Sequence, residues 1–104
     1  MKKSQGQDQV PMLKKWNGSN YTGDAWPYST LGEATHVSDK LNGGTPLADM
    51  GLYEQLVSVG QGEETWAAIS QDTGRAYAVR CNDKHGNWHK WYPAQPPKRQ
   101  SWDA

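Results

Sequence analysis

The sequence predicts a small α+β domain in which one helix packs on an antiparallel β-meander. Three observations support this class: three short runs with strand character, turn-forming residues between those runs, and a helical repeat of apolar residues ahead of them. The predicted strands cover about 65–70, 75–82 and 87–92, and the predicted helix covers about 46–59. A chain of 104 residues has the size of one domain and can fold without covalent cross-links.

The strands are bounded by residues that favour turns. Residues 71–74 have the sequence Gln-Asp-Thr-Gly, a hairpin connection in which Gly74 can adopt a positive φ. Residues 83–86 form the next turn, and Pro93 ends the third strand. The order of strand, turn, strand, turn and strand therefore predicts a meander.

Alternation along the third strand assigns its side chains to the two faces of the sheet. Trp88, Lys90 and Tyr92 are expected on one face, and His89 and Trp91 on the other. Both faces then carry large aromatic rings. One face can pack on the helix, and the other is expected to be partly exposed unless the N-terminal segment covers it.

The helix prediction depends on a cap and a spacing. Thr45 can cap the first turn, and Pro46 suits the first helical position. Apolar residues then recur at nearly helical spacing: Leu47, Met50, Tyr53 and Val57. Gly51 is unfavourable inside a helix, so residues 52–59 have an alternative as a strand. That alternative would make the fold an all-β meander or small barrel.

The rest of the chain is predicted to contribute loops and terminal segments. Residues 1–9 are polar and are expected to be a disordered N-terminus, residues 10–93 form the globular domain, and residues 94–104 form a proline-rich basic tail. Residues 29–44 show no strong period, so we expect loops and at most one added strand in the N-terminal third. A single cysteine, Cys81, excludes an internal disulfide framework and fits a reducing compartment. With no apolar run for export or membrane crossing, the expected location is cytoplasmic and the expected partners exclude a membrane.

The charges are separated along the chain although their formal sum is zero. Residues 75–101 carry six lysines and arginines against Asp83 alone. Residues 24–64 carry seven acids against Lys40 alone. The distribution indicates an anionic partner for the basic end, unless the acidic middle segment meets it within the fold.

The sequence offers weak candidates for catalysis or metal binding. Residues 72–74 spell Asp-Thr-Gly, which aspartic proteases use, but here the triplet joins two strands and favours a turn. Cys81, His85 and His89 are four residues apart but lack a fourth metal ligand of the usual kind. We therefore predict no metal site and no cofactor, and keep an enzyme with a site near His85 and His89 as an alternative.

The remaining function prediction is binding. The basic, aromatic C-terminal hairpin presents the residue types that anchor protein interfaces and that stack on nucleobases. Its candidate binding residues are Arg80, Lys84, His85, Trp88, His89, Lys90, Trp91 and Tyr92. The sequence thus predicts a non-enzymatic module that docks on a protein with an acidic patch, as an inhibitor or adaptor does. The alternative is a single-stranded nucleic acid, bound by stacking and phosphate contacts.

Overall fold

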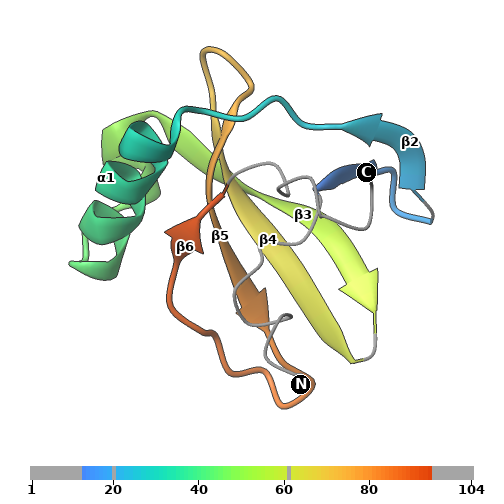
Figure 1. Ribbon diagram of the computed structural model, residues 1–104. Coiled ribbons are helices and arrows are strands. Elements are labelled where there is room, and N and C mark those ends of the chain that lie inside the picture. The colour runs from blue at the N-terminus through green and yellow to red at the C-terminus, as the bar shows by residue number, and fades with distance from the viewer. Residues whose placement is uncertain (1–12, 20, 61, 95–104) are drawn as a thin grey trace, which may run out of the picture.

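A four-stranded antiparallel sheet in the order β3-β4-β5-β6 forms the centre of the computed structural model (Figure 1), which describes residues 13–19, 21–60 and 62–94. Its strands are β3 (Leu52–Gly60), β4 (Glu63–Ser70), β5 (Ala76–Asn82) and β6 (Tyr92–Pro93). A separate hairpin of β1 (Lys14–Trp16) and β2 (Tyr21–Ala25) precedes the helix α1 (Leu31–Asn42) and the short 3₁₀ helix η2 (Leu47–Met50). One helix packed on an antiparallel meander confirms the predicted α+β class.

The predicted helix over 46–59 is wrong, because η2 ends after one turn and β3 follows it. Gly51 has a φ of +69°, and this left-handed residue ends the turn where the strand begins. From there Leu52 to Gly60 pair with β4 along their length. The alternative of residues 52–59 as a strand is therefore correct, although the all-β architecture attached to it is not.

The helix α1 lies in the segment for which the sequence predicted loops. Thr30 caps its first turn: the Thr30 hydroxyl accepts from the Glu33 N–H at 3.2 Å, and the Glu33 carboxylate accepts from the Thr30 N–H at 3.4 Å. Ala34, Val37 and Leu41 are buried at intervals of three and four residues. This stripe is short and partly made of small side chains, which explains why no period was seen.

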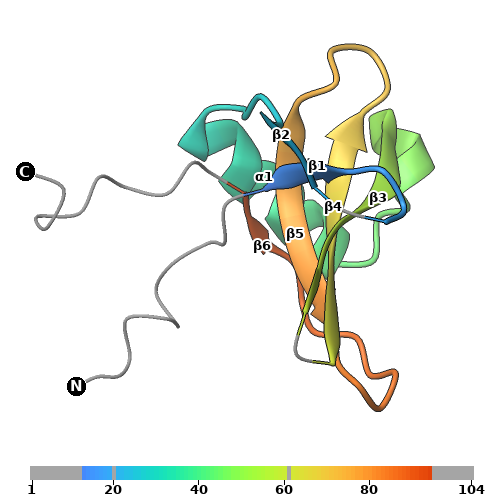
Figure 2. The same ribbon diagram turned by 90° about the vertical axis from the view of Figure 1, so that its right-hand side faces the viewer.

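The sheet is covered on both faces. On one face, called the helix side, Val37 and Leu41 pack against Leu52, Ala68 and Ala78. On the other face, called the hairpin side, buried residues from the sheet and its flanks form a second cluster: Leu13, Val57, Ala67, Ile69, Ala76, Val79 and Ala94. Figure 2 shows β1 lying across the strands on that side. The central strand β4 is therefore buried on both faces over its second half, from Ala67 to Ser70.

Trp26 and Tyr28 follow β2 and cover the hairpin-side cluster. The Leu13 N–H donates to the Tyr28 hydroxyl at 3.0 Å, which ties the segment before β1 to the segment after β2. Burial raises the pKa of the Tyr28 hydroxyl, so the ring stays neutral across the physiological range.

The predicted strands at 65–70 and 75–82 are confirmed by β4 and β5, but a continuous strand over 87–92 is wrong. Only a bridge between Asn82 and Trp88 and the two residues of β6 pair with β5 there. Trp91 accordingly packs on the helix side, whereas Tyr92 pairs with Val79 of the hairpin side. The predicted sharing of one face by Trp88 and Tyr92 is therefore wrong, because the intervening loop does not alternate.

Both ends of the chain lie outside the described residues. The predicted disordered residues 1–9 lie outside the described residues, and so does the predicted tail after Ala94. Ala94 itself is fully buried in the hairpin-side cluster, and its N–H donates to the Tyr77 carbonyl at 3.0 Å. Of the described part of the chain, no helix combines the length and the hydropathy needed to cross a bilayer.

Asn42, at the end of α1, holds the backbone of Trp91 with both ends of its amide. Its Nδ2 donates to the Trp91 carbonyl at 3.0 Å, and its Oδ1 accepts from the Trp91 N–H at 2.8 Å. This pair of hydrogen bonds, called the Asn42 clamp, fixes the segment before β6 against the helix. The Asn42 clamp thus attaches this segment in place of the backbone hydrogen bonds that a continuous strand would make.

We expect Asn42→Ala to lower the free energy of unfolding by about 1–3 kcal/mol, because two hydrogen bonds are lost together. Urea unfolding followed by circular dichroism measures the change. Asn42→Asp keeps the acceptor for the Trp91 N–H but turns a carboxylate oxygen toward the Trp91 carbonyl, so it should also be less stable than the wild type. Equal midpoints for Asn42→Ala and the wild type would contradict a stabilising clamp.

Candidate functional site

The guanidinium of Arg80 lies between two indole rings. Its central carbon is 4.5 Å from the ring centre of Trp88 and 4.5 Å from that of Trp91. Both distances are well within the range of a cation–π contact. We call Trp91, Arg80 and Trp88 the indole–arginine stack.

A carboxylate fixes the head of Arg80 in this stack. The Oε2 atom of Glu54 accepts from Nε of Arg80 at 3.1 Å and from Nη2 at 3.0 Å. Glu54 belongs to β3 and Arg80 to β5, so the pair spans β4. Ala68 of β4 pairs with Glu54 and is too small to separate the two side chains.

Trp66 holds the outer ring of the stack from the side. Its ring centre is 6.0 Å from that of Trp88, and the two planes meet at 69°, an edge-to-face arrangement. The Trp66 Nε1–H donates to Oε1 of Glu64 at 3.2 Å, and the same oxygen accepts from Nδ2 of Asn82 at 3.2 Å. Trp66 is therefore positioned by its own hydrogen bond as well as by packing.

The aromatic residues of the predicted site differ in exposure. Trp88 is 44% exposed, whereas Trp91 is only 5% exposed and belongs to the core. Tyr92 is 48% exposed, but it lies on the hairpin side. The structure thus brings together Arg80, Trp88 and Trp91 from the predicted set and separates Tyr92 from them.

The remaining predicted residues are exposed at the rim of this cluster. Lys84 and His85 lie in the turn after β5, and Lys90 places its Nζ 5.4 Å from the ring centre of Tyr92. The Nε2 atom of His89 is 3.8 Å from Oδ2 of Asp83. The cations are therefore spread over both sides of the sheet and do not form one continuous basic patch.

Asp83 organises the turn that leads to Trp88. Its Oδ1 accepts from the Asn87 N–H at 3.0 Å and from the His85 N–H at 2.8 Å. The hydrogen bond from Asn87 is the main cause that holds the pKa of the Asp83 carboxyl below its usual value, with His85 adding to it. The ionised Asp83 carboxylate therefore stabilises the turn fully above the ordinary pKa of aspartate. This stabilisation is lost only as the pH falls through the lower pKa of the folded state.

The acidic middle segment meets the basic hairpin within the fold. Glu54 pairs with Arg80, and Glu64 accepts a hydrogen bond from Asn82. Sequence reasoning missed Glu54, Glu64 and Trp66 as members of the site, although the strand that carries Trp66 was predicted. The opposite charges of the two segments indicated that they could pair. Identifying Glu54 as the partner of Arg80 also required the pairing register of β3.

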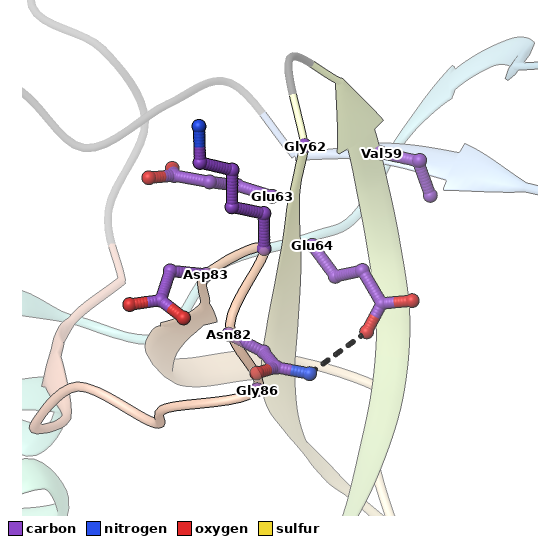
Figure 3. A pocket seen from close by; sticks show the side chains of 8 residues that line it. Val59, Gly62, Glu63, Glu64, Asn82, Asp83 and Gly86 are labelled. Atoms are coloured by element: carbon purple, nitrogen blue, oxygen red, sulfur yellow. Dashed lines mark hydrogen bonds between the residues drawn. The ribbon is translucent and has the colours of Figure 1, made fainter.

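A shallow hollow of about 400 Å³ opens at the end of the sheet beside the site. It is lined by the ends of β3, β4 and β5 and by the turn after β5: Val59, Gly62, Glu63, Glu64, Asn82, Asp83, Lys84 and Gly86. Figure 3 shows Glu64 and Asn82 pointing toward one another, with Glu63 and Asp83 directed to the other side. The Oδ1 atom of Asn82 is buried and accepts no hydrogen bond from the described residues.

The weak catalytic candidates are not assembled into a site. In the Asp-Thr-Gly turn, Gly74 has a φ of +76° and the Ser70 hydroxyl accepts from the N–H groups of Asp72 and Thr73, as a hairpin turn requires. The Sγ atom of Cys81 lies 3.9 Å from the Thr65 hydroxyl. Across residues 13–19, 21–60 and 62–94, no group of three potential metal ligands converges.

Comparison with protein-family models, with curated proteins and with solved structures found no match to this chain. The function is therefore argued from the geometry alone.

Proposed function

We propose that this protein is a non-enzymatic binding module that docks on a protein partner through Trp88. The single observation that carries the proposal is a large, exposed indole ring held rigidly by Arg80 and Trp66. Tryptophan is the residue type most enriched among interface hot spots. An inhibitor or adaptor role fits a domain of this size.

The rigidity of Trp88 matters because binding orders side chains at a cost. Immobilising one rotamer-rich side chain costs about 0.5–1.5 kcal/mol. Arg80, itself tied to Glu54, already restricts the ring on one side, and the edge contact with Trp66 restricts it further. The ring is thus preorganised for contact.

The charge arrangement favours a protein over a single-stranded nucleic acid. Two donor nitrogens of Arg80 already bond to Glu54 and its guanidinium contacts two indole rings, which leaves it poorly placed for phosphate. Trp91 is buried and unsuited to stacking on a base. An acidic patch on a protein partner would still find Lys84 and His85 exposed in the turn that leads to Trp88. A cytoplasmic location remains part of the proposal, supported by the single cysteine.

We expect Trp88→Ala to weaken partner binding at least about tenfold, mainly through faster dissociation. The matched control is Tyr92→Ala, which removes an equally exposed ring from the opposite side of the sheet. The wild type and both variants are immobilised and exposed to lysate of the producing cell, with and without nuclease. The retained proteins are identified by mass spectrometry, and the dissociation rate of each purified candidate is then measured.

The proposal is supported by a partner that is retained after nuclease treatment, dissociates quickly from the Trp88→Ala variant and remains bound to the Tyr92→Ala variant. Equal retention by all three proteins would overturn it. If retention requires nucleic acid, the alternative applies instead, and the affinity for a single-stranded oligonucleotide should fall steeply with salt. A weak salt dependence would exclude that alternative.

A further inference from the structure

Four residues stand in one row across the helix side of the sheet, at the edge of the hollow. Val59 of β3 pairs with Glu64 of β4, Glu64 pairs with Asn82 of β5, and Asn82 bridges to Trp88. The two ends of the row are apolar and exposed, since Val59 is 43% and Trp88 44% exposed. The two middle positions are polar and linked by a hydrogen bond (Figure 3).

The polar middle of this row offers acceptors. Oε1 of Glu64 accepts from two neutral groups, Trp66 and Asn82, and no lysine or arginine of the described residues pairs with this carboxylate. Oδ1 of Asn82 also lacks a donor within the described residues, but this atom is buried, so the Glu64 carboxylate supplies the acceptors of the row. Glu63 and Asp83 also line the hollow, but they point to its other side and lie outside this row. The row is therefore complementary to a cationic group with several donors.

The indole–arginine stack gives an example of an arginine held by an indole ring and a carboxylate together. Arg80 places its guanidinium against the Trp88 ring while a single carboxylate, Glu54, accepts two of its N–H groups. Arginine fits both requirements because its planar fork stacks on rings and pairs with carboxylates, whereas lysine is a compact point charge. Neighbouring strands are about 4.8 Å apart, so the backbones of Glu64 and Trp88 are about 10 Å apart, within the span of an arginine side chain and its own backbone.

We propose that the protein partner inserts an arginine side chain into this row, with its stem on Trp88 and its guanidinium on Glu64. The inference rests on the proposed docking through Trp88 and specifies the chemistry of the partner there. In this arrangement the partner's guanidinium takes the acceptors at Glu64 that no described cation occupies. Val59 closes the far end of the row with an apolar contact.

The test uses a defined peptide probe, so it does not depend on knowing the partner. The probe is the capped peptide Ala-Leu-Arg-Leu-Ala, and its control replaces arginine by citrulline, which keeps the shape and removes the charge. Binding is followed by NMR through the indole N–H signals, at up to about 5 mM peptide, which detects a millimolar Kd. We expect the arginine peptide to shift the signals of Trp66 and Trp88 and to bind at least tenfold more tightly than the citrulline peptide.

Two isosteric variants make the test specific. Glu64→Gln keeps an oxygen for Trp66 and Asn82 and removes the charge, so it should abolish the preference for the arginine peptide. Glu63→Gln removes a charge directed to the other side of the hollow (Figure 3) and should keep that preference. Equal binding of the two peptides, no shift with either, or equal behaviour of the two variants would overturn the arginine assignment.

The outcome is separable from that of the proposed function. A captured partner that is lost by Trp88→Ala but bound normally by Glu64→Gln would keep the docking proposal and reject the arginine. Loss of that partner by both variants, with retention by Glu63→Gln, would support the two together.

Discussion

Trp91→Ala should lower the free energy of unfolding by about 3–5 kcal/mol, the range for truncating a large buried aromatic side chain. Trp91 is 5% exposed, packs with the helix-side cluster and forms the inner ring of the indole–arginine stack. A domain of this size has a total stability of about 5–15 kcal/mol, so the variant is expected to be partly unfolded at 37 °C. Urea unfolding at 15 °C gives the difference from the wild type.

Two further variants keep this prediction open to test. Trp91→Phe retains a buried ring and should lose clearly less stability than the alanine variant. Tyr92→Ala removes the neighbouring ring, which is largely exposed, and should change the free energy of unfolding by about 1 kcal/mol or less. Equal urea midpoints for Trp91→Ala and Tyr92→Ala would show that Trp91 does not belong to the stabilising core.

Arg80→Ala should cost about 2–4 kcal/mol of stability although its side chain is partly exposed. Each of the two indole contacts contributes about 0.5–2 kcal/mol. The substitution also leaves Glu54 without its cation in a partly buried position. Thermal and urea unfolding measure the loss, and Trp88 should become more accessible to acrylamide quenching because its support is gone.

Two further arginine variants separate the effect of stacking from the effect of charge. Arg80→Lys keeps the charge and loses the planar stacking, so its stability should lie between those of the wild type and the alanine variant. Arg75→Ala removes an exposed arginine that donates one hydrogen bond to the Tyr28 carbonyl, and it should cost about 1 kcal/mol. A loss for Arg80→Ala no larger than that for Arg75→Ala would mean that the stack does not stabilise the fold.

The β4–β5 hairpin was predictable because local signals determine it. The turn at 71–74 and the strand-forming residues on both sides of it define β4 and β5 without help from distant parts of the chain. The helix was misplaced because Leu47, Met50, Tyr53 and Val57 have a helical spacing by coincidence. Pairing of β3 with β4 and the left-handed Gly51 override that spacing.

Three of the predicted binding residues, Arg80, Trp88 and Trp91, do come together, but their geometry could not be predicted from the sequence. Arg80, Trp88 and Trp91 meet because the turn at Asp83 and the Asn42 clamp position the segment between β5 and β6. Neither device is visible as strand alternation, so the faces of Trp88 and Tyr92 were predicted wrongly. Glu54 entered the site through a register that spans three strands, which a pattern along one segment does not contain.

The Asn42 clamp joins residues 49 positions apart, whereas the hairpins of the meander close over short turns. Long loops cost more entropy to close, so the meander is expected to fold before the last strand docks. The helix and the segment before β6 hold each other against β5, and release of one removes support from the other. In a partially open state the helix and the segment before β6 would detach together. Trp88 would then lose the contact with Arg80 that restricts its ring.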